Sequence, residues 1–64
     1  MQVQYDAVRF KEARNAQGWS RARLSKECGV SVRSIESYEQ ETRIPPAANA
    51  ERMAKALGLA EETY

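Results

Sequence analysis

The stretch SRARLSKECGVSVRSIESYE, residues 20–39, holds two short helical patterns separated by a single glycine. Ser20 and Ser31 each stand just before a helical pattern, where a serine hydroxyl can accept a hydrogen bond from an N–H group of the first turn. Gly29 stands between the patterns, where a helix commonly ends in a left-handed residue. We therefore expect two helices joined by a tight turn. Helices joined in this way cross at roughly 90–120°, so one can support the other as it enters a groove.

Working outward, the rest of the chain also has helical patterns, and strand signals are nearly absent. Asp6 suits the start of one helix, and the proline pair at 45–46 can open another, since proline is tolerated in the first turn. We expect helices over about 6–17, 21–28, 32–40 and 47–57, and a short helical turn over 61–64. The predicted fold is an all-α compact bundle of four to five short helices, formed by residues 1–64 as a single domain.

The spacing of apolar residues predicts which side of each helix is buried. In the helix expected over 32–40, a rotation of 100° per residue places Ile35, Tyr38 and Glu39 on one face. The helix expected over 6–17 has a looser apolar face that includes Val8. The predicted core consists of Phe10, Trp19, Leu24, Val30, Ile35, Met53 and Leu57.

Composition argues against several classes of function. The chain has one cysteine and no histidine, which argues against a disulfide and against a structural zinc site. No catalytic constellation is visible, so we expect no enzymatic activity, no cofactor and no small-molecule ligand. No apolar run approaches the roughly 20 residues that a membrane-spanning helix needs. A lone cysteine fits a reducing compartment, and we expect a cytoplasmic protein.

Charge is unevenly distributed along the chain. The net charge is only +1, but residues 9–33 carry seven basic residues against two glutamates. Residues 34–64 carry three basic residues against six glutamates. This pattern is consistent with a basic face and an acidic back. A solvated surface on which the two signs happen to segregate explains it equally well.

The stretch WSRARLSKECGVSVRSIESYEQETRIP, residues 19–45, resembles the helix-turn-helix of the lambda-repressor-like family, the Cro/repressor or XRE type. The shared positions are Ser20, Leu24, Gly29-Val30-Ser31, Ile35, Glu39 and Pro45. ERMAKALGL, residues 51–59, is similar to the fourth helix of that family, so the resemblance covers about residues 6–64. It implies a DNA-binding transcriptional regulator of bacterial, phage or mobile-element type. The helix over 32–40 would be its recognition helix in the major groove of double-stranded DNA.

Four residues of that helix are candidate base contacts. Arg33 could bind guanine in a bidentate manner, or could contact a phosphate or remain solvated. Val32 could meet a thymine methyl or pack at the helix edge, and Ser37 could reach a base or allow close approach. Glu36 could accept a hydrogen bond from cytosine N4, orient Arg33, or be a tolerated surface glutamate.

Five residues are candidate phosphate contacts: Ser20, Arg21, Arg23, Ser34 and Arg43. Ser20 and Arg21 lie at a helix N-terminus, where unpaired N–H groups and the helix dipole favour an anion. The family commonly has glutamine at the position of Arg21, so arginine here could lose a bond to the recognition helix. Arg23 and Ser34 could equally be plain surface.

Two further features concern the framework. The resemblance places Arg14 beside Glu39, and a carboxylate on the inner face of a helix needs such a partner. We therefore expect an ion pair between them. Glu41 stands where the family often has glycine, so the path of the following loop, and with it the placement of Arg43, is open.

A single recognition helix contacts few base pairs, so dimers that read two half-sites about 34 Å apart are the usual solution. We expect a monomer or a weak homodimer in solution, with the C-terminal segment around Leu59 and Tyr64 as the surface for self-association. The alternative function is a protein-interaction module on the same scaffold, such as an antitoxin or an adaptor. The low net charge, Glu36 and Glu41 favour that alternative.

Overall fold

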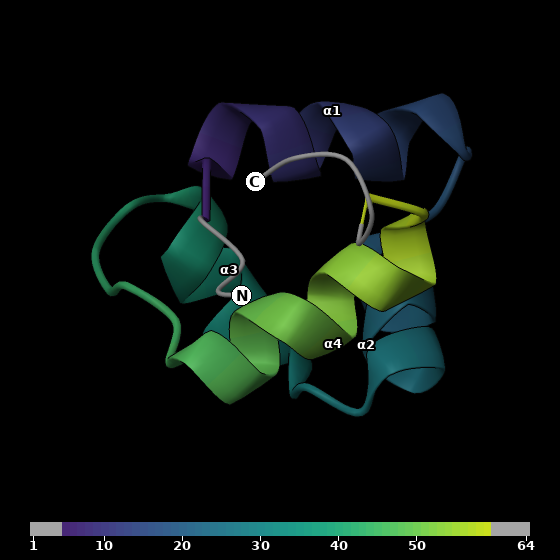
Figure 1. Cartoon of the computed structure of the whole chain (residues 1–64). Helices are drawn as coiled ribbons and strands as arrows, with labels where there is room; N and C mark the ends of the chain where they lie inside the picture. The colour runs from purple at the N-terminus through teal and green to yellow at the C-terminus, as the bar shows by residue number, and fades with distance from the viewer. Residues whose placement is uncertain (1–4, 60–64) are drawn as a thin grey trace.

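The structure is a computed structural model that describes residues 5–59, and within this range the chain forms four helices and no strand (Figure 1). They are α1 (Ala7–Ala16), α2 (Arg21–Cys28), α3 (Val32–Glu39) and α4 (Ala47–Leu57). The ranges expected for α1 and α3 were longer because they included the flanking cap residues. The turn expected over 61–64 lies outside the described residues. None of the helices in the described part is long and apolar enough to cross a membrane.

Three of the four helices begin at a side-chain cap. Asp6, Ser20 and Ser31 each accept a hydrogen bond from the backbone N–H three residues later, over 3.1, 3.1 and 3.2 Å. Such caps contribute about 1 kcal/mol each. α4 starts differently, because Pro46 occupies its cap position and makes no side-chain bond there. The fixed φ of proline sets the direction of the chain at that point instead.

The turn between α2 and α3 depends on a left-handed residue. Gly29 has φ 78°, and its N–H donates to the Ser25 carbonyl over 2.8 Å, which closes the end of α2. A residue with a Cβ resists this conformation, because the Cβ approaches the following carbonyl oxygen. Val30 is then buried and Ser31 caps α3, so three successive residues complete the turn.

α3 ends in the same conformation without a glycine. Among residues 5–59, Glu41 is the one non-glycine residue with positive φ, at 63°. Its N–H donates to the Tyr38 carbonyl over 3.2 Å, and the Thr42 N–H donates to the Ser37 carbonyl over 3.0 Å. This pair of bonds is the Schellman motif in which glycine is usual. The loop thus keeps a glycine-type exit, at a cost of about 1–2 kcal/mol for placing glutamate there.

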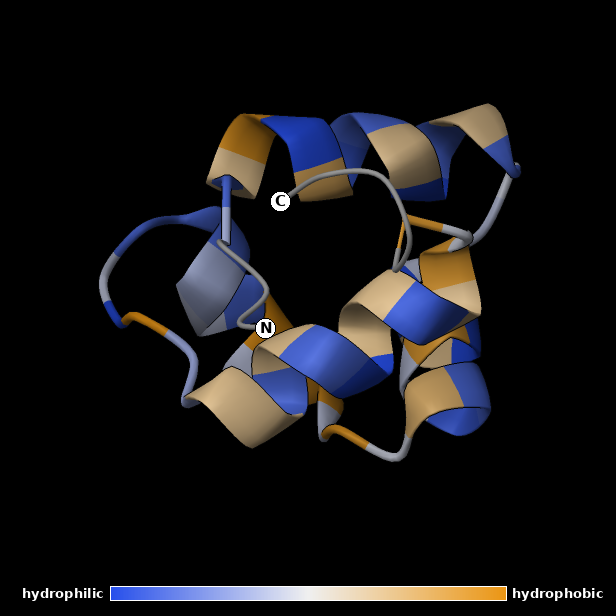
Figure 2. Ribbon diagram, viewed as in Figure 1, coloured by the Kyte–Doolittle hydropathy of each residue, from blue (hydrophilic) through white to orange (hydrophobic). Residues whose placement is uncertain are grey.

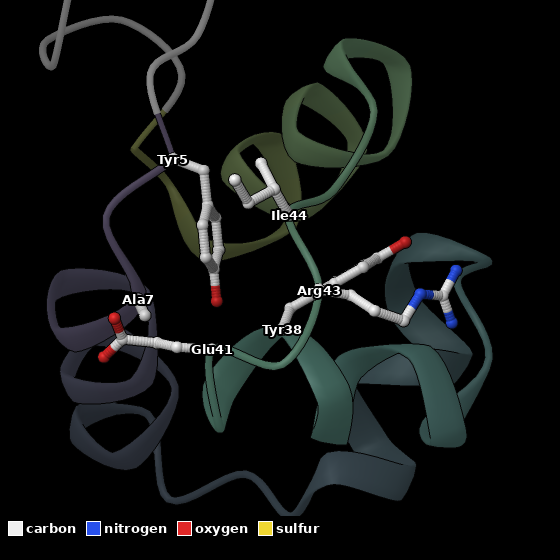
Figure 3. Close-up of a pocket in the computed structure, with 6 residues that line it drawn as sticks. All are labelled: Tyr5, Ala7, Tyr38, Glu41, Arg43 and Ile44. Carbon is white, nitrogen blue, oxygen red and sulfur yellow. The ribbon is translucent and has the colours of Figure 1, made fainter.

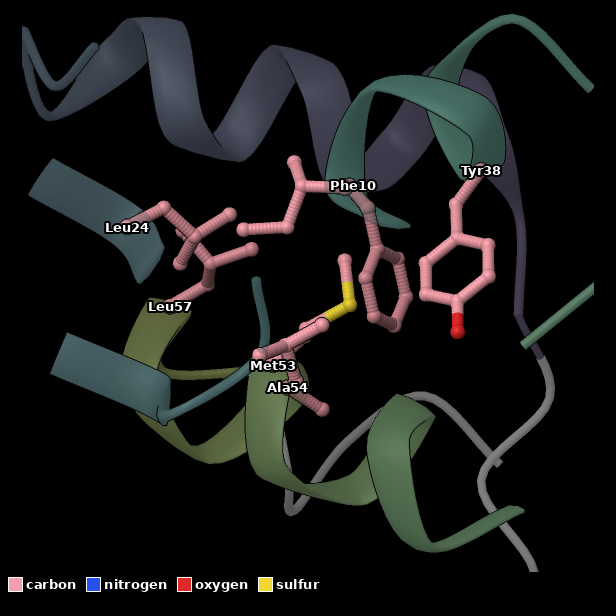
Figure 4. Close-up of a cluster of buried hydrophobic side chains, with 8 residues drawn as sticks. Phe10, Leu24, Tyr38, Met53, Ala54 and Leu57 are labelled. Atoms are coloured by element: carbon pink, nitrogen blue, oxygen red, sulfur yellow. The ribbon is translucent and has the colours of Figure 1, made fainter. Parts of the chain in front are cut away.

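The helices enclose one core. α1 and α2 each pack against both α3 and α4. The side chains that meet between them come from all four helices and from the turn after α2, and Figure 4 shows most of them converging on Met53. The core cluster consists of Phe10, Leu24, Val30, Ile35, Tyr38, Met53, Ala54 and Leu57. Full burial of one of the larger side chains stabilises the fold by about 1.5–3 kcal/mol.

Val8 was predicted to face the core and does not, and Trp19 was predicted to lie within the core and only borders it. Val8 is 59% exposed, since two steps of 100° place it 200° around α1 from Phe10, and both cannot face inward. Trp19 is half-buried and packs against the edge of the core instead of lying within it. Its ring lies under the guanidinium of Arg23, at 5.0 Å from the ring centre. Figure 2 shows the resulting pattern, with apolar and polar segments alternating around each helix.

Candidate nucleic-acid interface

α3 presents two opposite surfaces. Its inner surface carries Ile35 and Tyr38, which are 0% and 1% exposed. Its outer surface carries the four side chains predicted to contact bases, of which Val32, Arg33 and Glu36 are exposed and Ser37 is half-buried. The helix is therefore held firmly on one side and leaves a short polar surface on the other.

Arg33 stands at the second residue of α3, on its exposed surface. Among residues 5–59, its side chain has no hydrogen-bond or ion-pair partner. All five N–H donors of the guanidinium are thus available to a planar acceptor pair such as guanine O6 and N7. Arg14 of α1 and Arg21 of α2 differ from Arg33, because each of them is bonded to Glu39 of α3.

The expected pair between Arg14 and Glu39 is present and buried. Arg14 Nε donates to Glu39 Oε2 over 2.7 Å, and Arg14 Nη2 donates to Oε1 over 3.0 Å. The two side chains are 9% and 2% exposed. Arg14 Nη1 also donates to the Trp19 carbonyl over 2.8 Å, so one guanidinium ties α1 to α3 and to the segment that leads into α2.

Arg21 provides a second cation for the same carboxylate. Its Nε donates to Glu39 Oε1 over 3.0 Å. Burial raises the pKa of Glu39, but the hydrogen bonds from Arg14 and then Arg21 outweigh burial and hold this pKa below its ordinary value. Glu39 therefore stays ionised, and it joins α1, α2 and α3 at one point.

Arg21 also reaches the outer surface of α3. Its Nη1 lies 3.5 Å from Glu36 Oε2, and the two side chains are 33% and 48% exposed. The structure shows Glu36 paired with Arg21 and not with Arg33, whose orientation by Glu36 was one of the sequence-based alternatives. Glu36 precedes Glu39 by three residues, so both carboxylates lie on the side of α3 that faces the start of α2. Arg21 stands where the family commonly has glutamine, and it still donates a hydrogen bond to α3, at Glu39.

The other predicted phosphate contacts near α2 and α3 also have partners within the chain. Ser20 Oγ accepts from the Arg23 N–H as the helix cap, and Arg23 Nε donates to Glu27 over 2.8 Å. Ser34 Oγ accepts from Ser31 Oγ over 3.0 Å. The hydroxyls of Ser20 and Ser34 act as acceptors in these bonds, so each still has its hydrogen to donate. The side chain of Arg23 is 52% exposed. Their places on the surface leave the phosphate role open to them.

Arg43 lies in the loop after α3, with its guanidinium 5.6 Å from the centre of the Tyr38 ring. The loop borders a cavity of about 320 Å³ lined by Tyr5, Ala7, Tyr38, Glu41, Arg43 and Ile44. Figure 3 shows the charged ends of Glu41 and Arg43 pointing in different directions at this cavity. Opposite charges that diverge do not make an anion site, so this cavity does not mark a place for a phosphate.

Two contacts that sequence reasoning did not identify hold α3 in place. Asn49 Nδ2 donates to the Tyr38 hydroxyl over 3.2 Å, which links α4 to α3. The second is the contact of Arg21 with both glutamates of α3. The sequence carries only a partial signal for it: the i,i+3 spacing of Glu36 and Glu39 indicates a carboxylate pair but does not say which cation faces it.

The described part of the chain contains no cluster of three or more His, Cys, Asp or Glu residues that could hold a metal ion. Cys28 is half-buried at the end of α2, and burial raises the pKa of its thiol, which makes it a poor nucleophile. The chemistry of this surface is therefore that of charged and hydrogen-bonding side chains.

The sequence profile of the helix-turn-helix family matches residues 10–63. The match covers all of α2, α3 and α4 and most of α1. No curated protein and no solved structure matches the chain significantly. With this match across most of its length, the chain belongs to the helix-turn-helix family of the XRE, lambda-repressor-like type, a family of DNA-binding regulators.

Proposed function

We propose that this protein binds specific sites in double-stranded DNA and regulates transcription, with α3 in the major groove. The observation that carries this proposal is the combination of a free, exposed Arg33 at the start of α3 and a helix fixed from behind. A guanidinium can bind guanine in a bidentate manner only while its donors are not engaged elsewhere, and the fixed helix sets the place from which it reaches. The major groove of B-DNA is about 12 Å wide and admits one α-helix.

Within α3 the four outer residues take different roles. Arg33 donates to guanine O6 and N7, and the methyl groups of Val32, which is 42% exposed, meet a thymine methyl. Ser37 is small and half-buried, so it lets the helix approach the base edges. Glu36 accepts from the N4 amine of cytosine. Together these side chains cover a few base pairs.

Phosphates on either side of the groove are bound by residues at the edges of this surface. Ser20 and Arg21 offer an N–H-rich helix start, where a phosphate is favoured. Arg23 and Ser34 flank it, and Arg43 serves the opposite edge from the loop after α3. These contacts fix the register of α3 without reading sequence.

Two copies bind one operator in this proposal, because the eight residues of α3 span about 12 Å, a third of a helical turn of DNA. Leu59 is half-buried and packs against the core, so less of it is free for a dimer contact than expected. Tyr64 lies outside the described residues. A repressor-like action, in a bacterium, phage or mobile element, would follow where the operator overlaps a promoter.

The test is a selection from random duplex DNA with the purified protein at two salt concentrations. A two-fold symmetric motif with half-sites one helical turn apart is expected, and affinity should fall steeply as salt rises. Arg33→Ala should remove the preference at its guanine and keep the salt-sensitive binding. Arg52→Ala, an exposed arginine on α4, is the matched charge control. Unchanged selectivity in the Arg33 variant would refute its role.

A second function is favoured by one observation. Ile44 is 87% exposed in the loop after α3. An exposed isoleucine suits contact with another protein, as in an antitoxin or an adaptor. This function predicts no enrichment of any DNA motif and no binding to DNA at low salt.

A further inference from the structure

Arg21 makes two contacts of very different strength with α3. Its Nε is bonded to Glu39, whose side chain is 2% exposed and also held by Arg14. Its Nη1 lies at the limit of hydrogen bonding, 3.5 Å from Glu36, whose side chain is 48% exposed. Buried ion pairs are disrupted at high cost, whereas exposed pairs contribute little. The Nε end is thus an anchor and the Nη end is an exchangeable contact.

The exchangeable end lies where a phosphate would arrive. Arg21 is the first residue of α2, directly after its cap Ser20. The N–H groups of that first turn and the helix dipole favour an anion at this place. Glu36 supplies an anion to the guanidinium of Arg21 from within the protein, because its Oε2 lies 3.5 Å from Nη1. A phosphate and Glu36 would therefore compete for the Nη donors of Arg21.

Resting on the proposed function, we propose that Arg21 and Glu36 form an exchange pair that couples backbone contact to base readout. In the free protein, Glu36 occupies the Nη end of Arg21. When DNA docks, a phosphate takes those donors while Nε stays on Glu39. The released carboxylate then accepts from a cytosine N4 amine in the major groove. Arg21 is the positioning residue in this scheme, and Glu36 determines specificity.

The scheme explains why a glutamate is present on a surface that faces DNA. An unpaired carboxylate there would repel phosphates in every complex. Pairing with Arg21 neutralises Glu36 until a phosphate is close. Opposite a base without an amine donor, the released carboxylate finds no partner, and its desolvation penalises that site. Glu36 therefore acts mainly by rejecting bases that present no amine donor in the major groove, which are guanine and thymine.

The first experiment is a double-mutant cycle on binding to a random-sequence duplex at about 50 mM salt, where weak binding is enhanced. Glu36→Gln in the natural background should tighten binding by about two- to five-fold, the range of an exposed ion pair. In an Arg21→Gln background the competition has gone, so the same change should give a clearly smaller gain, limited to removing a charge near the phosphates. Glu51→Gln, an exposed glutamate on α4, gives the effect of the charge change alone.

The variants are expected to fold, because Arg14 alone still donates twice to Glu39 when Arg21 is replaced. Circular dichroism at the assay temperature checks this directly. If Glu36→Gln tightens binding equally in both backgrounds, Glu36 acts by general repulsion and the exchange is refuted. If the natural protein binds no DNA at all, the proposed function fails instead, so the two failures are distinguishable.

The second experiment reads the base preference. Selection from random duplexes with the natural protein should enrich cytosine at one position per half-site, and Glu36→Gln should lose about tenfold of that preference. Arg21→Gln should keep the preference for cytosine at that position, while binding weakens at every site. Retention of the cytosine preference in Glu36→Gln would overturn the assignment of Glu36.

Discussion

α3 is entered through the turn at residues 29–31 and left through the loop at residues 40–46, and the two connections are built in different ways. Each contains one residue in the left-handed conformation, with φ 78° at Gly29 and 63° at Glu41. At the entry that residue is glycine, which adopts the conformation freely. At the exit it is glutamate, which adopts it at a cost.

Neighbouring residues complete the entry. Val30 is 4% exposed and fastens the turn to the core, and Ser31 caps α3. Each of these three consecutive residues adopts a role that its side chain favours, so residues 29–31 alone define the turn. This local agreement explains why the sequence alone predicts the two helices and the position of the turn.

Residues from other parts of the chain complete the exit. Glu39 is held by Arg14 and Arg21, and Tyr38 accepts from Asn49 and lies beside Arg43. These contacts come from α1, α2, α4 and the loop itself. They compensate for a turn residue that local preference would not place there. One end of α3 is thus encoded locally and the other by tertiary contacts.

Glu39→Ala should have the largest effect, because it removes the tertiary support of the exit. It leaves Arg14 buried and unpaired, which typically costs about 3–5 kcal/mol. A domain of this size has little stability to spare, so the variant should be largely unfolded at 37 °C. Thermal and urea unfolding followed by circular dichroism measure the change. Glu51→Ala, an exposed glutamate on α4, should shift stability by at most about 0.5 kcal/mol. A similar small shift for Glu39→Ala would contradict the view that the exit depends on this pair.

The same pair predicts how stability depends on acid. The hydrogen bonds from Arg14 and Arg21 outweigh the effect of burial and hold the folded-state pKa of Glu39 below its ordinary value. The stabilisation is therefore fully present above that ordinary value and is lost as pH falls through the folded-state pKa. Urea unfolding from pH 7 to pH 3 should show this loss for the natural protein. In Glu39→Gln the part due to this residue should be absent, and an identical pH profile would count against the assignment.

Gly29→Ala tests the entry in the same way. No heavy atom beyond the adjacent residues lies within 4 Å of a Cβ placed there, so the effect is that of the backbone alone. We expect a loss of about 1–2 kcal/mol from the left-handed conformation. This corresponds to a fall in Tm of several degrees, at about 4–8 °C per kcal/mol for such a domain. A neutral result would mean that the turn relaxes to another conformation in which alanine is not strained.

The helices, the caps and the buried pair of Arg14 with Glu39 were within reach of the sequence, because each depends on spacing or on a family pattern. The contact of Arg21 with Glu36 was not. It depends on how closely the start of α2 approaches α3, which is set by packing and not by any neighbour of Arg21. Val8 was assigned to the wrong side of α1 for another reason: the apolar pattern of that helix is weak, so the pattern does not define one buried face.

Glu41→Gly should reverse the difference between the two connections. Removing the left-handed penalty of about 1–2 kcal/mol is partly offset by the greater freedom of glycine in the unfolded chain, about 0.5–1 kcal/mol. The net expectation is a gain of about 0.5–1 kcal/mol, visible as a higher Tm. Glu41→Ala is the control, since it removes the charge but keeps the conformation. An equal gain in both variants would show that the charge, and not the backbone, is responsible.

Ile44→Ser should have the smallest effect on folding, although it changes a large apolar side chain. Ile44 is 87% exposed, so its removal takes almost no apolar area from the core, and stability should change by at most about 0.5 kcal/mol. Leu24→Ser, at a core position that is 1% exposed, provides the contrast of a variant that fails to fold.

An exposed isoleucine that folding does not need is explained if the exit loop contacts another macromolecule. Size-exclusion chromatography and DNA-binding titrations of Ile44→Ser test this. Loss of two-site operator binding with intact single-site binding would place a second copy of the chain at this loop. If neither the chromatography nor the DNA binding changes, Ile44 makes no contact with a second copy or with DNA. The exposed loop is then a tolerated feature of a helix end that tertiary contacts already hold.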